Sequence, residues 1–369
     1  MSTDLAIFAA TSGHSGVDRV LRNLVPAIAR LGVTVDVLGI EGHGPHFDQL
    51  PEGARHLPLG AHHVNSAIPA LIRYLRRERP QAMLSDKDRV NRAALLARVV
   101  ARVPTRIGLR QGTTVSVNLA SRGVMDRWVQ TLSMRWCYPA ADALLVPSAG
   151  AADDLAAFAR LPRARIHVVP SPILTDALSI RAAQPLDHPW FAEGQVPVIL
   201  GVGELSERKD FATLLRAFAQ VRGARSCRLM ILGEGRRRGE LERLAAELGV
   251  ADDVALPGFT ANPYPYMARA AVFALCSRWE GMPVVLIEAL ALGAPSVACD
   301  CPSGPREVLA GGAVGPLVPV GDVAALADGL CRQLEQPVPG AQSRAAVAGY
   351  SDSASARAYL AALGFKAFQ

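Results

Sequence analysis

The chain has 369 residues, of which 50% are apolar and 20% are charged, with a formal net charge of +6. This composition is typical of a soluble α/β protein of two domains and excludes a disordered or fibrous chain. No run approaches the roughly 18 apolar residues of a membrane-spanning helix. The short apolar run after Asp4 has no basic segment before it, so we expect a first strand rather than a signal peptide, and a cytoplasmic protein.

The positive charge is concentrated in the first half. Residues 1–180 contain 21 lysines and arginines against 14 acidic residues, whereas residues 181–369 carry a net charge of −1. The basic run RYLRRERP from Arg73 is compatible with a solvated helix face and, equally, with an anionic membrane surface or an anionic lipid-linked acceptor. Peripheral association with the inner face of the cytoplasmic membrane is therefore an open interpretation. Aromatic residues do not interleave with the arginines, so a nucleic-acid partner is not expected.

The first 40 residues predict a βαβ unit of Rossmann type. It consists of a strand over 5–10, a glycine-containing loop, an amphipathic helix over 17–32 and a strand over 33–40. Gly13 and Gly16 do not complete a dinucleotide fingerprint, so the loop alone is either a tight turn or a place where backbone approaches a ligand. Five histidines lie in the loop-rich residues 41–63, and we expect surface histidines there rather than a metal site.

The next two strands end in polar residues. Helices are predicted from Ser66 to Pro80 and from Arg89, with strands from Gln81 and Thr105. Parallel sheets bind ligands at the carboxyl ends of their strands, so the residues that follow these strands are candidates for the acceptor side of a site. They are Asp86, Lys87, Arg110, Gln111 and Thr113.

A helix from Ser121 has a one-sided apolar pattern, which we expect to face the core rather than to bind a ligand. The residues on that face are Met125, Trp128, Val129, Leu132 and Trp136. The proline-containing link from about 170 to 196 is typical of a hinge. We therefore predict domains over residues 1–180 and 190–350, with a helical tail over 351–369 packed on the first domain. The six scattered cysteines are expected to be buried free thiols.

The second half repeats the strand–helix alternation and contains a helix that is apolar almost all round. It begins at Pro283 and stops at Gly293, which predicts a buried helix. Glu288 lies in its middle and Glu280 in the loop before it. A buried carboxylate needs partners, so Glu288 is either paired with a nearby arginine or amide, or held ready for the hydroxyl groups of a ligand. The N–H groups at the helix start suit a phosphate.

Glu280-GMPVVLI-Glu288 is an E-x7-E pattern, and four further blocks accompany it in order. They are GVGELSERKDFATLLRAF from Gly201, LMILGEGRRRGELERLAAELGV from Leu229, VALPGFTANPYPYMARA from Val254 and DCPSGPREVL from Asp300. With these blocks the second half closely resembles glycosyltransferase family 4, and the first half resembles it loosely. The resemblance implies the GT-B fold, an α/β fold in which two Rossmann-like domains face each other across a cleft and a C-terminal helix crosses back to the first domain. It also implies a nucleotide-diphosphate sugar as co-substrate, retention of configuration, and neither a metal nor another cofactor.

The resemblance also implies residue roles. Lys209, with Arg208 beside it, would neutralise the leaving diphosphate, and Glu280 would hold the donor sugar, so these three are the predicted catalytic residues. Glu288 would bind the ribose. The predicted donor-binding residues are Gly16, Glu204, Gly233, Gly258, Phe259, Thr260, Gly281, Met282, Pro283, Val284 and Glu288, with Ser303 and Gly304 near the sugar.

Several positions depart from the family pattern: Ser15 stands at the first glycine position of the early loop, Asp18 where glutamate is common, and Ser171 where asparagine is common. Two further departures concern the site directly. Glu204 stands where the family commonly has arginine, and no histidine follows the strand from Thr105. A carboxylate cannot replace an arginine on phosphate, because its charge has the wrong sign. We therefore expect Glu204 to position Arg208 or a sugar hydroxyl.

The sequence thus predicts a retaining glycosyltransferase that moves a sugar from a nucleotide-diphosphate sugar to an acceptor hydroxyl. By resemblance, the acceptor is a saccharide or a lipid-linked saccharide in bacterial cell-surface polysaccharide or lipopolysaccharide assembly. Two alternatives stay open: a nucleotide-sugar epimerase of the same fold, which needs no acceptor, and a non-catalytic sugar-nucleotide binder in which Glu204 marks lost activity.

Overall fold

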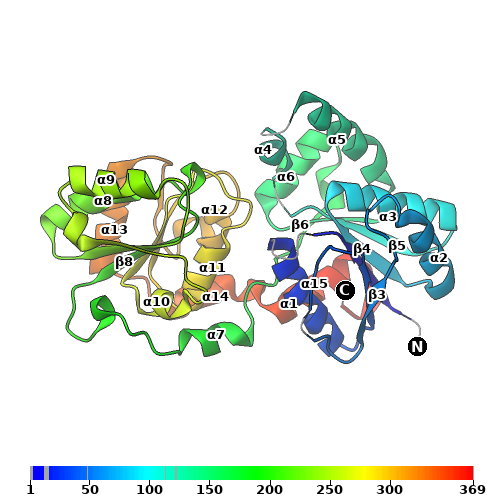
Figure 1. Cartoon of the computed structure of the whole chain (residues 1–369), viewed down its shortest axis with the longest axis horizontal. Helices are drawn as coiled ribbons and strands as arrows, with labels where there is room; N and C mark the ends of the chain where they lie inside the picture. Colours follow the sequence, from blue (N-terminus) through cyan, green and yellow to red (C-terminus); the bar gives the residue numbers. More distant parts are fainter. Residues whose placement is uncertain (1–2, 12–15, 48, 113, 121–122, 369) are drawn as a thin grey trace. The chain divides into compact units, whose positions relative to one another are not determined.

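The computed structural model describes residues 3–11, 16–47, 49–112, 114–120 and 123–368. The chain divides into an N-terminal unit, residues 1–173 and 350–369, and a C-terminal unit, residues 174–349. Each unit is built on one parallel sheet with helices between successive strands (Figure 1). The predicted α/β fold with two Rossmann-like sheets is therefore confirmed.

The N-terminal unit has a seven-stranded sheet in the order β3-β2-β1-β4-β5-β6-β7. The order reverses between β1 and β4, which makes the carboxyl ends of these two strands the topological switch point, where ligands of such sheets bind. The strands are β1 Leu5–Ala9, β2 Val35–Gly39, β3 Ala54–Pro58, β4 Ala82–Asp86, β5 Arg106–Arg110, β6 Ala143–Val146 and β7 Ile166–Val168.

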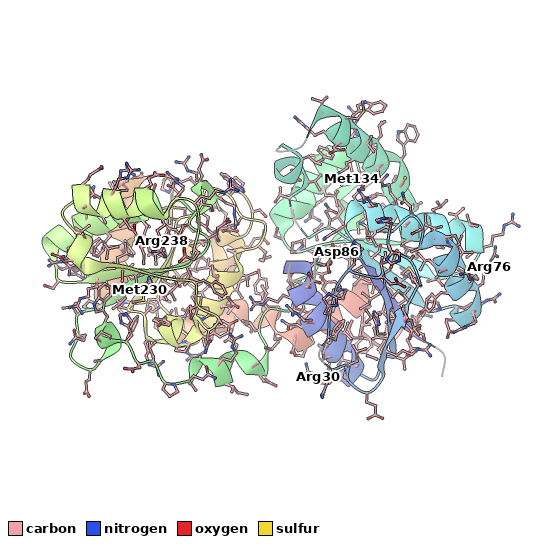
Figure 2. All side chains as sticks on the ribbon, viewed as in Figure 1. Arg30, Arg76, Asp86, Met134, Met230 and Arg238 are labelled. Carbon is pink, nitrogen blue, oxygen red and sulfur yellow. The ribbon has the colours of Figure 1, made fainter. Side chains whose placement is uncertain are left out.

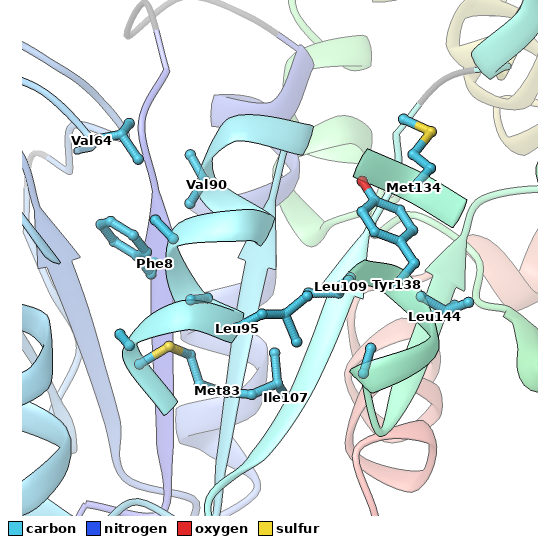
Figure 3. Packing of buried hydrophobic residues seen from close by; sticks show 14 of the residues in the cluster. Phe8, Val64, Met83, Val90, Leu95, Ile107, Leu109, Met134, Tyr138 and Leu144 are labelled. Atoms are coloured by element: carbon cyan, nitrogen blue, oxygen red, sulfur yellow. The ribbon is translucent and has the colours of Figure 1, made fainter. Parts of the chain in front are cut away.

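Helices cover both faces of this sheet, because successive strand residues point to opposite faces and both sets are apolar. Phe8 and Met83 pack on one face with Tyr138 (Figure 3), under α2 (Ile68–Glu78), α3 (Asp88–Ala101), α5 (Val124–Cys137) and α6 (Ala149–Ala159). Ile7 packs on the other face, under α1 (Gly16–Arg30) and α15 (Asp352–Ala362).

The C-terminal helix α15 belongs to the N-terminal unit. Arg30 of α1 forms an ion pair with Asp352, and the amide of Ile173 donates to Tyr350 O at 3.0 Å. Deeper in the unit, Arg110 Nε donates to the Tyr359 hydroxyl at 2.8 Å, and the same guanidinium forms an ion pair with Asp86, which Figure 2 labels. Both charged side chains of that pair are only 4% exposed.

Residues 41–63, predicted to be loop, contain the edge strand β3. Its residues are mostly exposed, so it shows no apolar alternation by which the sequence could reveal it. Its backbone pairs in parallel with β2 along its whole length, and an ion pair adds to this: Arg55 Nε donates to Asp36 Oδ1 of β2 at 2.6 Å. Burial acts to raise the pKa of Asp36, but hydrogen bonds from Arg55, Thr3 and Tyr74 outweigh burial and lower it.

The link after residue 170, predicted to be a hinge without regular structure, contains α7 (Asp176–Ala182). Arg181 of this helix lies over the ring of Tyr264 at 4.8 Å, and its carbonyl accepts from Asn262 Nδ2 at 3.0 Å. These contacts attach the link to the C-terminal unit. Three short helices also escape sequence analysis: α4 (Val115–Ala120), α12 (Pro305–Val308) and α14 (Gly340–Val347).

The prediction that the apolar face of the helix from Ser121 points to the core is wrong. In α5 it is Met134, followed by Tyr138, that packs inwards (Figure 3), whereas Trp128 and Trp136 are 62% and 79% exposed. The periodicity identified a shared face correctly, but a period does not say which way that face points.

The C-terminal unit has a six-stranded sheet in the order β10-β9-β8-β11-β12-β13, so its switch point lies between β8 and β11. Its strands are β8 Val198–Val202, β9 Arg228–Leu232, β10 Val254–Gly258, β11 Val272–Leu275, β12 Ser296–Cys299 and β13 Leu317–Val318. Besides α7, α12 and α14, its α-helices in the described residues are α8 (Phe211–Ala224), α9 (Arg238–Glu247), α10 (Tyr264–Arg269), α11 (Val284–Ala291) and α13 (Val323–Glu335).

Breaking the buried ion pair beneath α15 should destabilise the N-terminal unit strongly. Asp86→Ala leaves the Arg110 guanidinium buried without a counter-charge, and we expect the free energy of unfolding in urea titrations to fall by about 3–5 kcal/mol. Asp153→Ala is a matched control, because it removes the partner of Arg163 in an exposed ion pair and should change little. Equal losses in the two variants would contradict a structural role for the Asp86–Arg110 pair.

Candidate active site

The predicted donor-side residues gather at the carboxyl edge of the C-terminal sheet. The loop after β8 contains Arg208 and Lys209, and the loop after β11 contains Glu280. β8 and β11 are the two strands on either side of the switch point, so their loops meet there. Two contacts to main-chain oxygens tie them together: the Arg278 amide donates to Arg208 O at 2.8 Å, and the Cys276 thiol donates to Lys209 O at 3.0 Å.

Glu280 is the meeting point of the predicted catalytic side chains. Its Oε1 accepts from Lys209 Nζ at 2.5 Å and from Ser277 Oγ at 2.7 Å. Its Oε2 accepts from Arg208 Nη1 at 2.9 Å. The side chains of Glu280 and Lys209 are 4% and 9% exposed, whereas Arg208 is 36% exposed. One carboxylate thus faces two cations, and the cluster keeps a net positive charge that an anion can reach through Arg208.

Glu288 is a separate buried carboxylate. It lies in the middle of α11, is 2% exposed, and its Oε1 accepts from the Tyr264 hydroxyl of α10 at 2.9 Å. α11 begins at Val284 rather than at Pro283, which occupies the N-cap position. The Val284 amide donates to Met282 O at 2.9 Å, so it is already bonded and does not point freely at a phosphate.

Two glycines allow close backbone approach around the site. A side chain at Gly233, after β9, would lie 1.9 Å from Gly203 O, after β8. A side chain at Gly304, whose φ is +102°, would lie 2.4 Å from Pro283 Cδ. The turn after β12 therefore rests directly on the start of α11, where Ser303 Oγ donates to Gly281 O at 3.2 Å.

The other residues predicted to bind the donor lie at the same edge of the C-terminal sheet, except Gly16, which lies in the N-terminal unit. Among the described residues the exposed Glu204 carboxylate has no hydrogen-bond or ion-pair partner, so the expected contact with Arg208 is not made. Phe259 is 78% exposed, and Thr260 Oγ1 accepts from the Asn262 amide at 3.3 Å. Gly258 ends β10, and its carbonyl accepts from the Gly233 amide. Gly16 is the first residue of α1 in the N-terminal unit.

The acceptor-side predictions separate into buried and accessible residues. Asp86 and Arg110 are buried against each other and against Tyr359, so their contacts are structural rather than open to an acceptor. Lys87 is exposed and adopts a φ of +75° at the start of α3. Gln111 is buried, and its Oε1 has no hydrogen-bond partner among the described residues. Thr113 lies outside the described residues.

Several site residues escape sequence analysis. Ser277 shares the Glu280 carboxylate with Lys209, Tyr264 bonds Glu288, and Asp210 accepts from Arg278 Nε at 3.1 Å. The position of Ser277, three residues before Glu280, is the signal that could have identified it. The other two partners are distant in sequence, so no spacing indicates them.

The cysteines and histidines form no metal site in the described part of the chain. No group of three or more metal-ligating side chains gathers there, and all six cysteines are free thiols. Burial raises the pKa of Cys301, near the site, to about 12, so this thiol stays protonated at neutral pH.

Two family models match the chain. The model "Glycosyl transferases group 1" matches residues 196–336, and the model "Glycosyl transferase 4-like domain" matches residues 15–172. Together they span most of both units. The chain belongs to the family 4 type of glycosyltransferases, as the sequence blocks predicted.

Curated relatives are similar over part of their length. The N-acetylgalactosamine-N,N'-diacetylbacillosaminyl-diphospho-undecaprenol 4-alpha-N-acetylgalactosaminyltransferase of Campylobacter jejuni is 33% identical over 248 residues, 67% of this chain and 65% of the relative. The lipopolysaccharide core biosynthesis glycosyltransferase LpsE of Rhizobium meliloti is 35% identical over 142 residues, 38% of this chain and 39% of the relative. The chain thus matches between 39% and 65% of the length of these relatives.

Solved structures match over almost the whole chain. The apo form of the lipopolysaccharide outer core galactosyltransferase WaaB has a TM-score of 0.75 at 18% identity, covering 98% of this chain and 99% of that one. Anabaena Alr3699/HepE in complex with UDP has a TM-score of 0.72 at 15% identity, with the same coverage. At such identities the likeness establishes the GT-B fold alone. Of the helices in the described ranges, none is long and apolar enough to cross a membrane.

Removing the shared carboxylate should destabilise the C-terminal unit. Glu280→Gln leaves the buried Lys209 ammonium without a counter-charge, and we expect the free energy of unfolding to fall by about 3 kcal/mol. Glu207→Gln changes an exposed carboxylate in the same loop and is the matched control. A urea titration in which both variants unfold at the wild-type midpoint would contradict the ion-pair geometry.

Proposed function

We propose that the protein is a retaining glycosyltransferase that transfers a sugar from a nucleotide-diphosphate sugar to an acceptor hydroxyl. The observation that carries this proposal is the Glu280 carboxylate bonded to both Lys209 and Arg208 at the switch point of the C-terminal sheet. Membership of the glycosyltransferase family supports the same reaction class.

The two cations suit the charge that develops on the leaving group. When the bond between the anomeric carbon and the diphosphate breaks, negative charge grows on the diphosphate oxygens, and fixed cations stabilise it. In the free protein Glu280 holds Lys209 and Arg208 in position, so they are preorganised for the anion. When the donor binds, its diphosphate takes over these cations and the carboxylate becomes available to the hydroxyl groups of the donor sugar.

We propose that attack occurs on the face of the sugar from which the diphosphate leaves, which retains the configuration. The acceptor oxygen bonds to the anomeric carbon, and a departing phosphate oxygen takes the acceptor proton, so no separate protein base is required. Because Lys209 and Arg208 supply the positive charge on the diphosphate, we expect transfer to need neither a metal ion nor another cofactor.

The expected acceptor is a saccharide or lipid-linked saccharide of a bacterial cell-surface polysaccharide or lipopolysaccharide. The relatives' names support this class, since one describes a diphospho-undecaprenol-linked acceptor and another lipopolysaccharide core biosynthesis. A lipid-linked acceptor would also require peripheral contact with the inner face of the membrane. UDP is the first donor nucleotide to test, because Alr3699/HepE is described in complex with UDP.

A thermal-shift panel of UDP-, GDP-, ADP- and TDP-sugars, with and without magnesium, should identify the donor. Binding to the folded state raises the Tm, and a ligand at 100 times its Kd adds about 2.7 kcal/mol of stability. We expect one nucleotide sugar to shift the Tm by several degrees, and EDTA to leave that shift unchanged. If no nucleotide sugar shifts the Tm, the donor assignment is wrong.

The same variants test turnover. Glu280→Gln should still respond to the bare nucleoside diphosphate, because both cations remain, but transfer should fall by at least about 100-fold. Glu207→Gln should transfer at the wild-type rate. An epimer formed from the donor without any acceptor would favour the epimerase alternative, and donor binding without turnover would favour the non-catalytic binder.

A further inference from the structure

The helix α5 of the N-terminal unit presents its apolar face to solvent. Val124, Met125, Trp128, Val129 and Trp136 are 83%, 72%, 62%, 40% and 79% exposed. Trp128 lies four residues after Val124, and Trp136 lies eight residues after Trp128, so the three side chains lie along one stripe of the helix, with Met125 and Val129 beside them. We call these five residues the α5 stripe. A surface helix of a globular protein normally has the opposite orientation, with its polar face outwards.

The inward face of α5 is held by specific contacts, so the exposed stripe is not the result of a loosely placed helix. Ser133 Oγ donates to Asp88 Oδ1 of α3 at 3.1 Å, and Met134 is fully buried in the core of the unit. Tyr138, directly after α5, is also fully buried, and its hydroxyl donates to the same carboxylate oxygen at 3.3 Å. Burial raises the pKa of Asp88, which these two hydroxyls partly offset.

The last turns of α3 also expose apolar side chains, although they lie at the other end of that helix from Asp88, which contacts α5. Of the thirteen large apolar side chains that are exposed in the described residues, eight lie on α3 and α5. The three on α3 are Leu96, Val99 and Val100. Exposed apolar surface gathered in one place marks an interaction site more often than chance exposure does.

The α5 stripe lies towards the carboxyl edge of the N-terminal sheet. α3 starts at that edge with Asp88, directly after β4, and Asp88 contacts Ser133 in the second half of α5. α5 runs towards the amino end of the sheet, where Asp142 precedes β6 (Figure 1). The nine residues before Ser133 therefore extend about 13 Å beyond the start of α3, at a rise of about 1.5 Å per residue. Most of the stripe thus projects on the side of the sheet where an acceptor would bind.

We propose that the α5 stripe inserts into the headgroup region of an anionic lipid bilayer. Tryptophan with aliphatic residues on one helix face and arginine nearby is the pattern of an interfacial helix. Arg127 on α5 and Arg89 on α3 are exposed, and Arg92, paired with Asp88, lies next to α5. These cations complement anionic headgroups, and residues 1–180 as a whole carry a net charge of +7.

Charge also argues against a second copy of the chain as the occupant. Beside the stripe, Arg89, Arg92 and Arg127 outnumber Asp88 and Asp126. A two-fold contact through the stripe would therefore oppose two surfaces of the same net sign, which disfavours association. The membrane assignment rests on the proposed function for its biological role. It deepens that function, because a lipid-linked acceptor would lie in the bilayer into which the stripe inserts.

Vesicle binding tests the assignment independently of catalysis. The full chain should co-sediment with vesicles of phosphatidylcholine mixed with phosphatidylglycerol, and more weakly with phosphatidylcholine alone. The double variant Trp128→Gln/Trp136→Gln should lower the partition coefficient for the mixed vesicles by at least about tenfold, because two interfacial anchors are lost. Both tryptophans are exposed, so the fold and the Tm should not change.

Ile180→Gln is the matched control, because Ile180 is an exposed apolar residue of the C-terminal unit, 69% exposed. It should bind vesicles as the wild type does. The assignment is overturned if the double variant binds vesicles as well as the wild type does, or if the wild type does not bind them. It is also overturned if the wild type forms a dimer that the double variant abolishes. The thermal shift with a nucleotide sugar does not involve α5. If that shift is retained but the wild type does not bind vesicles, the membrane-binding role of the α5 stripe is refuted and the proposed glycosyltransferase function is not.

Discussion

The candidate active site depends on one carboxylate that serves two cations. Lys209 is buried, and Glu280 provides its counter-charge at 2.5 Å while also holding the more exposed Arg208. The arrangement fixes two positively charged side chains, one buried and one accessible, before any ligand arrives. The contacts of Glu280 also link the loops after β8 and β11. The same contacts therefore stabilise this edge of the sheet and position the two cations for a ligand.

The N-terminal unit uses a similar device for a different purpose. At the carboxyl ends of β4 and β5, Arg110 forms an ion pair with Asp86 and donates a hydrogen bond to Tyr359 of α15. The two residues predicted to face an acceptor therefore hold the C-terminal helix instead. Lys87 and the outward face of α5 are accessible near this edge. The unit therefore combines a buried ion pair that fixes α15 with an exposed apolar helix face and an excess of positive charge over residues 1–180.

Much of the architecture could be predicted from the sequence, because apolar periodicity and glycine or proline stops define strands and helices locally. The buried α11 with Glu288 in its middle is an example. Contacts between distant residues could not be predicted: Lys209 and Glu280 are 71 residues apart, and the family pattern assigns them to different parts of a ligand rather than to each other. The strand β3 was missed because its side chains are mostly exposed and show no apolar alternation, although its backbone pairs with β2. The direction of α5 was missed because a period defines a face without its orientation.

The most direct test of this account is a structure of the protein with its nucleotide-diphosphate sugar bound. The account predicts that Lys209 and Arg208 contact the diphosphate oxygens and that Glu280 has turned to the hydroxyl groups of the donor sugar. A diphosphate bound elsewhere, with the contacts of Glu280 to both cations intact, would contradict it.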